Sequence, residues 1–230
     1  MPLRLSLSAL ALLALAAMAF WPGYLSKLAI ADRYTHAHAA LGTCWLLLLV
    51  AQPLLINATL RSSHRILGRI GLLVGASFFV SGILIAHRSV ARMGVDQFAR
   101  EGRFLYLPLA MAGIFALALL LAVVWRRTPA MHARFMSATA LPLIDPLVAR
   151  LLFFYAPPLP AEALYQAPAF ALATGLLVAM LVSLPAISRG RPSFLYFSLV
   201  VVVVLLGFFV VPHTPTWLAF AAWFRALPMT

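Results

Sequence analysis

The sequence is short of the residues that fill the surface of a soluble protein. Of its 230 residues only five are acidic, 10% are charged and 64% are hydrophobic, and its mean hydropathy is +1.02. A chain of this composition cannot hide its apolar side chains in a soluble core of ordinary make-up. The sequence therefore predicts an integral membrane protein.

Other scarcities exclude particular chemistries. Cys44 is the only cysteine, so neither a disulfide within the chain nor a cysteine-based metal site is available. The only lysine, Lys27, lies in a predicted loop, which excludes a retinal Schiff base. GxSxG and GxxxxGK[ST] signatures are absent. The net charge of +12 comes from basic residues placed singly or in pairs at the ends of apolar runs, which does not suit nucleic-acid binding.

Seven apolar stretches follow one another along the chain, and they predict an all-α polytopic membrane protein with one transmembrane domain over residues 1–230. The first stretch ends in Ala17-Met18-Ala19, which could serve as a signal-peptidase site, but an aromatic belt follows it and favours a retained helix. The predicted spans are 5–21, 36–56, 66–87, 105–125, 131–155, 167–187 and 194–211, and an interfacial helix is expected at 214–227.

The distribution of charge predicts the orientation in a bacterial inner membrane. With seven spans, nine arginines and no acid share one side, whereas eight basic residues and all five acids share the other. Because basic residues favour the cytoplasmic side, we expect the N-terminus in the cytoplasm and the C-terminus in the periplasm.

The third span carries a histidine at each end. His64 and His87 are 23 residues apart, which is about 35 Å along a helix and roughly the thickness of a bilayer core with part of each interface. A stripe of glycines runs between them, where another helix or a flat cofactor can approach the backbone: Gly68, Gly71, Gly75 and Gly82.

The histidines fall into two groups by depth. His64 and His132 begin the third and fifth spans from the cytoplasmic side, and two imidazoles at one depth can ligate a b-type haem, with nearby arginines to pair with its propionates: Arg65, Arg69 and Arg134. The competing interpretation is that both histidines only lie among lipid headgroups.

The outer group consists of His36, His38 and His87, with Asp145 at about two thirds of the depth of its span. If His36 lies before the second helix begins, which Thr35 as its N-cap makes only marginally possible, the four side chains could hold Zn, Fe or Cu. On a regular helix, His36 and His38 would instead point about 200° apart.

Asp145 lies between Pro142 and Pro146, so its helix should kink or open nearby. A carboxylate at this depth is costly unless it is paired, with Arg150 or an outer histidine as the candidate partner. The structural alternative is a buried aspartate that caps the backbone groups freed by the prolines.

Several motifs together resemble a family of uncharacterised bacterial inner-membrane proteins, a domain of unknown function with HRxLGR followed by HxRxM. They are HRILGR at 64–69, SG at 81–82, HARFM at 132–136 and DPLVAR at 145–150, with FWPGYLSK at 20–27, HAH at 36–38 and QPLLI at 52–56. The resemblance implies a helical membrane bundle and supplies no catalytic residues. Histidine placement alone also gives a weaker similarity to diheme b-type cytochromes.

Three functional hypotheses are left. The first is a b-type haem protein that passes electrons across the membrane. The second is a non-catalytic metal-handling or assembly factor for a respiratory membrane complex. The third is a purely structural membrane subunit. The lipid bilayer is the expected partner in all three, and the sequence does not decide whether the protein is an enzyme.

Overall fold

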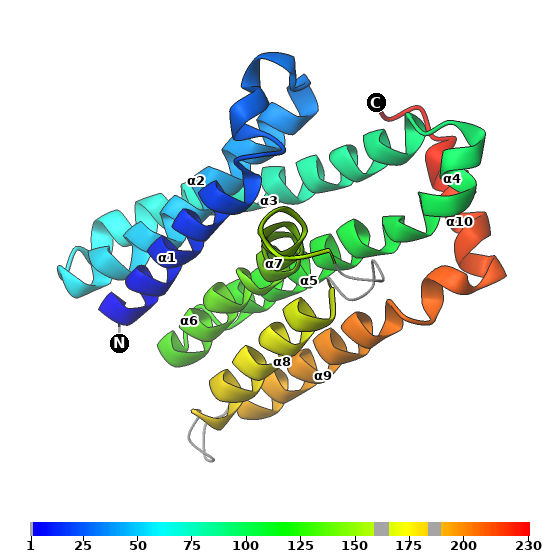
Figure 1. The fold of residues 1–230 in the computed structure, drawn as a ribbon. Coiled ribbons are helices and arrows are strands. Elements are labelled where there is room, and N and C mark those ends of the chain that lie inside the picture. The colour runs from blue at the N-terminus through cyan, green and yellow to red at the C-terminus, as the bar shows by residue number, and fades with distance from the viewer. Residues whose placement is uncertain (1, 159–165, 184–189) are drawn as a thin grey trace.

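The computed structural model describes residues 2–158, 166–183 and 190–230, and within these ranges the secondary structure is helical throughout, without a β-strand. Six helical segments are long and apolar enough to cross a membrane. The chain therefore has the architecture of a multi-pass membrane protein (Figure 1).

Three antiparallel helices open the chain: α1 (Pro2–Phe20), α2 (Arg33–Asn57) and α3 (Arg61–Ala91), with a short 3-10 helix η1 (Leu25–Ile30) before α2. The prediction that Thr35 caps α2 is wrong. Asp32 is the cap, because its side chain accepts hydrogen bonds from the backbone N–H groups of Tyr34 and Thr35 at 2.9 and 3.2 Å. His36 and His38 thus both lie inside a regular helix.

The segment expected to be a loop after the third span is largely helical. It forms α4 (Val95–Glu101) and η2 (Gly102–Leu105), which lead into α5 (Tyr106–Val124). The expected fifth span is divided into α6 (Pro129–Ala138) and α7 (Leu141–Tyr155). The break falls at Thr139–Ala140, upstream of Asp145, because Pro142 lies in the first turn of α7, where a missing backbone N–H costs nothing.

The last part of the chain contains α8 (Gln166–Val182), α9 (Arg191–Gly207), η4 (Val211–His213) and α10 (Pro215–Arg225). At 17 residues α8 is about 26 Å long, slightly short of the roughly 30 Å of a bilayer core. Residues 184–187 of the expected sixth span lie outside the described residues, so a count of seven crossings stays a prediction. Helix α10, capped by the Thr214 hydroxyl, matches the helix expected at 214–227.

Two hydrophobic clusters meet at α5. Phe115 faces the cluster built from α1, α2 and α3, whereas Ile114, Ala118 and Ala122 face the cluster built from α6, α7, α8 and α9. A third, smaller cluster joins the end of α3 to α10. Helix α5 is therefore the central element that holds the early and late helices together.

The helices run back and forth between two ends of the bundle (Figure 1). We call the end with the start of α1 and the α2–α3 and α5–α6 turns the N-terminal end, and the end with η1, α4 and α10 the opposite end. The chain's two termini lie at different ends.

The glycine stripe of α3 serves helix packing. A Cβ on Gly71 would contact Leu48 at 3.5 Å, and one on Gly75 would come within 2.8 Å of the Trp45 ring and of Leu119. Side chains of α2 and α5 thus fill the space beside the stripe, as close helix contacts in membranes require. The middle of the stripe has no room for a flat cofactor.

Candidate histidine site

His64 and His132 are brought together at the N-terminal end. His64 lies in the first turn of α3 and His132 in the first turn of α6. Their ring centroids are 6.5 Å apart and their planes are nearly perpendicular, at 88°. Both residues are half-buried. The two side chains at the starts of α3 and α6 therefore lie next to each other at this end of the bundle.

The hydrogen-bonding of His132 fixes its tautomer. Its Nδ1 lies 2.8 Å from the backbone carbonyl oxygen of Ala122, in the last turn of α5. A carbonyl only accepts, so a neutral His132 donates through Nδ1–H and keeps a lone pair on Nε2. This is the arrangement in which a histidine can ligate a metal through Nε2 while a carbonyl orients its ring. The same bond also satisfies an end carbonyl of α5.

His64 is held by a side chain from α2. When the Gln52 amide is oriented so that its oxygen and nitrogen match their neighbours, its nitrogen donates to Nδ1 of His64 and, at 3.3 Å, to the His64 carbonyl oxygen, while its oxygen accepts from the Gly68 N–H at 2.9 Å. A neutral His64 that accepts at Nδ1 carries its hydrogen on Nε2. With the amide oriented in this way, the two neutral imidazoles carry their hydrogens on different nitrogens, Nε2 in His64 and Nδ1 in His132.

The three arginines expected beside this pair have different environments. Arg65 and Arg69 are exposed. Arg134 is 8% exposed, and its guanidinium donates to the carbonyl oxygens of Ser183 at 3.0 Å and Ala130 at 3.2 Å. Arg134 thus connects α6 to the end of α8. Among the described contacts, Arg65 and Arg69 make no hydrogen bond of this kind to another helix.

The outer residues are not brought together. The side chain of His36 bonds the Tyr24 hydroxyl at 2.9 Å, that of His38 bonds the Ser81 hydroxyl at 2.9 Å, and that of His87 bonds the Thr230 hydroxyl at 2.8 Å. Within the described ranges, no three His, Cys, Asp or Glu side chains are grouped as metal ligands would be. The outer metal site stays a prediction from the sequence.

Asp145 is a separate feature of the bundle. It is 8% exposed, and its Oδ1 is buried without a hydrogen-bond partner among the described residues. Arg150, the partner considered from the sequence, donates instead to the Pro146 carbonyl at 3.1 Å and lies over the Phe20 ring at 4.6 Å. The arginine therefore joins α7 to the end of α1.

An ion-pair cluster at the opposite end was not foreseen. Asp32 pairs with Arg88 at 3.2 Å and with Arg92 at 3.5 Å, and so ties the start of α2 to the end of α3. Burial acts to raise the pKa of Asp32, but backbone hydrogen bonds from Thr35 and Tyr34 and the interaction with Arg88 outweigh it and lower that pKa. The cluster serves as a structural fastener.

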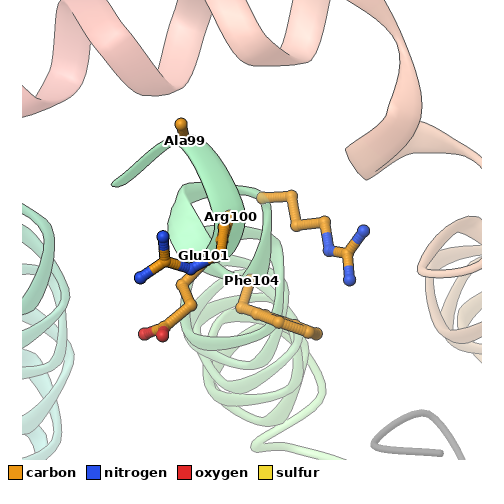
Figure 2. A pocket seen from close by; sticks show the side chains of 5 residues that line it. Ala99, Arg100, Glu101 and Phe104 are labelled. Carbon is orange, nitrogen blue, oxygen red and sulfur yellow. The ribbon is translucent and has the colours of Figure 1, made fainter. Parts of the chain in front are cut away.

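A shallow pocket also lies at the opposite end, lined by Ala99, Arg100, Glu101, Arg103 and Phe104 (Figure 2). Its charged groups already have neighbours: Gln97 donates to Glu101 at 3.0 Å, and the Arg103 guanidinium lies 5.0 Å from the centre of the Phe104 ring. None of the residues predicted to bind haem or metal lines this pocket.

No family model matches the chain, and neither a curated protein nor a solved structure matches it. The resemblance to the HRxLGR proteins and to diheme cytochromes therefore stays an expectation from motifs.

Proposed function

We propose that the protein binds one b-type haem at the N-terminal end of its bundle, with His64 and His132 as axial ligands, and passes electrons through it. The observation that carries the proposal is the 6.5 Å between the two ring centroids. Two metal–nitrogen bonds of about 2 Å each, with about 1 Å from ring nitrogen to ring centre on each side, require about 6 Å. Two imidazoles from different helices thus have the spacing for one iron.

The surroundings of the pair support this assignment in part. The Ala122 carbonyl orients the His132 ring and leaves its Nε2 lone pair available. Arg65 and Arg69, exposed on the first turns of α3, are suited to pair with the propionates. Since the glycine stripe is filled by neighbouring side chains, the porphyrin must be accommodated at the end of the bundle. When bound, the haem would supply one-electron transfer.

The proposal is limited to one haem and does not include a second haem that would carry electrons across the whole membrane. A second haem would need paired ligands at the opposite end, and the histidines there have separate hydrogen-bond partners. We therefore propose a single haem on the cytoplasmic side of a bacterial inner membrane, exchanging electrons with respiratory-chain membrane proteins.

The test is an absorption spectrum of the purified protein in detergent after supplementation with haemin. We expect one haem per chain, with a Soret band and sharp reduced-state bands typical of six-coordinate low-spin iron. The matched control is the double variant His64→Ala/His132→Ala, which should bind haemin no better than empty micelles. A wild-type protein that behaves like this control would contradict the proposal and favour histidines that only face the headgroups.

A further inference from the structure

Helices α3 and α5 pack against each other in antiparallel directions (Figure 1), and their contact shows which residues share a depth. A Cβ on Gly75 would lie 2.8 Å from Leu119, so these two residues mark the contact. Toward the N-terminal end, Arg69 is six residues from Gly75 and Arg127 is eight residues from Leu119. At about 1.5 Å per residue, the two arginines differ in depth by only about 3 Å.

The same contact shows which side of the helix pair each arginine occupies. Successive residues of an α-helix are about 100° apart, so Arg65 and Arg69 lie about 80° and 120° round α3 from Gly75. Arg127 lies about 80° round α5 from Leu119, in the same sense along the chain. In an antiparallel pair, rotation in the same sense brings side chains to the same side of the contact. The three arginines therefore share one side of the α3–α5 pair, and all three are exposed.

Exposed apolar side chains continue this side toward the middle of the bundle. Leu72 of α3 and Leu120 and Val124 of α5 lie about 60–140° round from the contact in the same sense, and each is at least 41% exposed. Near the opposite end α10 covers the same side, where the His87 ring packs on Phe224 at 5.4 Å. We call the open part the α3–α5 face: Arg65, Arg69, Leu72, Leu120, Val124 and Arg127.

The arginines of the α3–α5 face lack the intramolecular partners that arginines at the opposite end have. There, Arg88 pairs with Asp32, and Arg225 donates to the Met93 carbonyl. Among the described residues, the three guanidinium groups of the face have no hydrogen bond, ion pair or ring contact, and the acidic residues lie at the opposite end or in α7. The face thus carries three positive charges without a counter-charge from the described chain.

We propose that the α3–α5 face binds an anionic phospholipid. Its phosphate would accept hydrogen bonds from Arg65, Arg69 and Arg127, and its acyl chains would lie along Leu72, Leu120 and Val124. Charge at the end of the helices followed by exposed apolar surface toward the middle is the order in which a lipid presents its phosphate and its chains. A phosphate without chains would leave the apolar part of the face unused.

The first test measures lipid binding to the haem-free protein in detergent by native mass spectrometry, because Arg65 and Arg69 are also suited to haem propionates. We expect phosphatidylglycerol to bind more tightly than phosphatidylcholine, and an equal concentration of inorganic phosphate not to displace it. Arg69→Gln/Arg127→Gln should weaken phosphatidylglycerol binding by about thirtyfold, at about fivefold for each arginine near the membrane surface.

The matched control is Arg4→Gln/Arg100→Gln, which removes two exposed arginines from α1 and α4 and so changes the net charge equally. Its phosphatidylglycerol affinity should stay within about twofold of the wild type. An equal loss in both double variants would mean that only the overall charge attracts the lipid, and would overturn the proposal. Equal binding of the two lipids, or displacement by inorganic phosphate, would also overturn it.

The second test uses the unaltered chain, so it does not depend on the folding of a variant. Phosphatidylglycerol with a photoreactive group in one acyl chain is added as a minor component to phosphatidylcholine nanodiscs that contain the protein. We expect crosslinks concentrated at Leu72, Leu120 and Val124. Crosslinks equally frequent at Val203 and Val210, on the exposed apolar surface of α9 and just after it, would show ordinary bilayer contact and overturn the proposal.

Discussion

The two ends of the bundle contain similar residues but arrange them differently. At the N-terminal end, His64 and His132 come from separate helices and lie with their ring centroids 6.5 Å apart. At the opposite end, His36, His38 and His87 each bond a different hydroxyl group. The comparison shows that histidines gathered at one end of the bundle need not lie next to one another.

Helix rotation accounts for the difference. Because α2 begins at Arg33, His36 and His38 are both helical and point about 200° apart. His38 stacks on Phe78 at 4.7 Å, whereas His87 packs against Phe224 of α10 at 5.4 Å. The outer histidines thus contact different neighbours, whereas the rings of His64 and His132, in the first turns of α3 and α6, lie 6.5 Å apart.

The largest expected effect is a difference in haem binding between the two ends. We expect His64→Ala and His132→Ala each to lower bound haem by about tenfold or more, since an axial ligand contributes at least as much as its outer partners. His38→Ala should stay near the wild-type value. Haem per chain, measured as the pyridine complex, provides the readout. An equal loss in the His38 variant would remove the distinction between the ends.

The second largest effect is a loss of stability on replacing Arg134, which connects α6 to the end of α8. We expect Arg134→Leu to lower the free energy of unfolding by about 2–3 kcal/mol, because it leaves end carbonyls of α8 without a charged donor. Arg65→Leu, at an exposed position, should change it by less than about 0.5 kcal/mol. Denaturant unfolding in micelles compares the two. Similar losses would mean that the Arg134 contacts contribute little.

Gly75, midway along α3, tests how closely α2 and α5 pack against that helix. Gly75→Ala should cost about 1–3 kcal/mol, because its Cβ would lie 2.8 Å from Trp45 and Leu119. Gly113→Ala on α5 meets nothing within 4 Å and should be neutral or stabilising by up to about 1 kcal/mol. Thermal unfolding of both variants is the measurement, and a tolerated Gly75→Ala would indicate looser packing between α2 and α3.

The smallest effect is expected at the ion-pair cluster of the opposite end. Asp32→Ala should cost about 1 kcal/mol at pH 7, mostly from the lost helix cap. The pKa of Asp32 is lowered in the folded protein, so its contribution is complete above the ordinary aspartate pKa of about 4 and is lost as pH falls through the folded value.

The wild type and Asp32→Ala should therefore converge in stability on acidification below about pH 4. Asp96→Ala, on the exposed first turn of α4, is the control and should give little difference at either pH. A gap between the wild type and Asp32→Ala that persists in acid would assign the Asp32 effect to something other than its charge.

Features governed by length and hydropathy could be predicted from the sequence. Six long apolar helices, a terminal α10 and the common depth of His64 and His132 follow from spacing alone. Haem binding by this pair also requires the two imidazoles to point toward each other. Their direction depends on how α3 and α6 are rotated about their own axes, which the spacing of residues in the sequence does not determine.

The features that could not be predicted from the sequence depend on contacts between segments far apart in the chain. In the sequence, Gln52 is noted only as part of the QPLLI motif within an apolar helix. Its amide contacts His64 and Gly68, which lie on another helix, and the sequence does not show this. Thr139, at the break between α6 and α7, likewise has a partner on a distant helix, since its hydroxyl accepts from the Trp45 indole at 3.1 Å. Asp32 and Thr35 are both good capping residues, so the sequence does not decide which of them caps α2.

The central claim, that His64 and His132 share one iron, is tested most directly by electron paramagnetic resonance and near-infrared magnetic circular dichroism of the ferric haem-loaded protein. Two imidazole ligands with ring planes near the observed 88° should give a low-spin, strongly anisotropic signal and a bis-histidine charge-transfer band. A high-spin signal, or a low-spin spectrum unchanged in His132→Ala, would contradict the account.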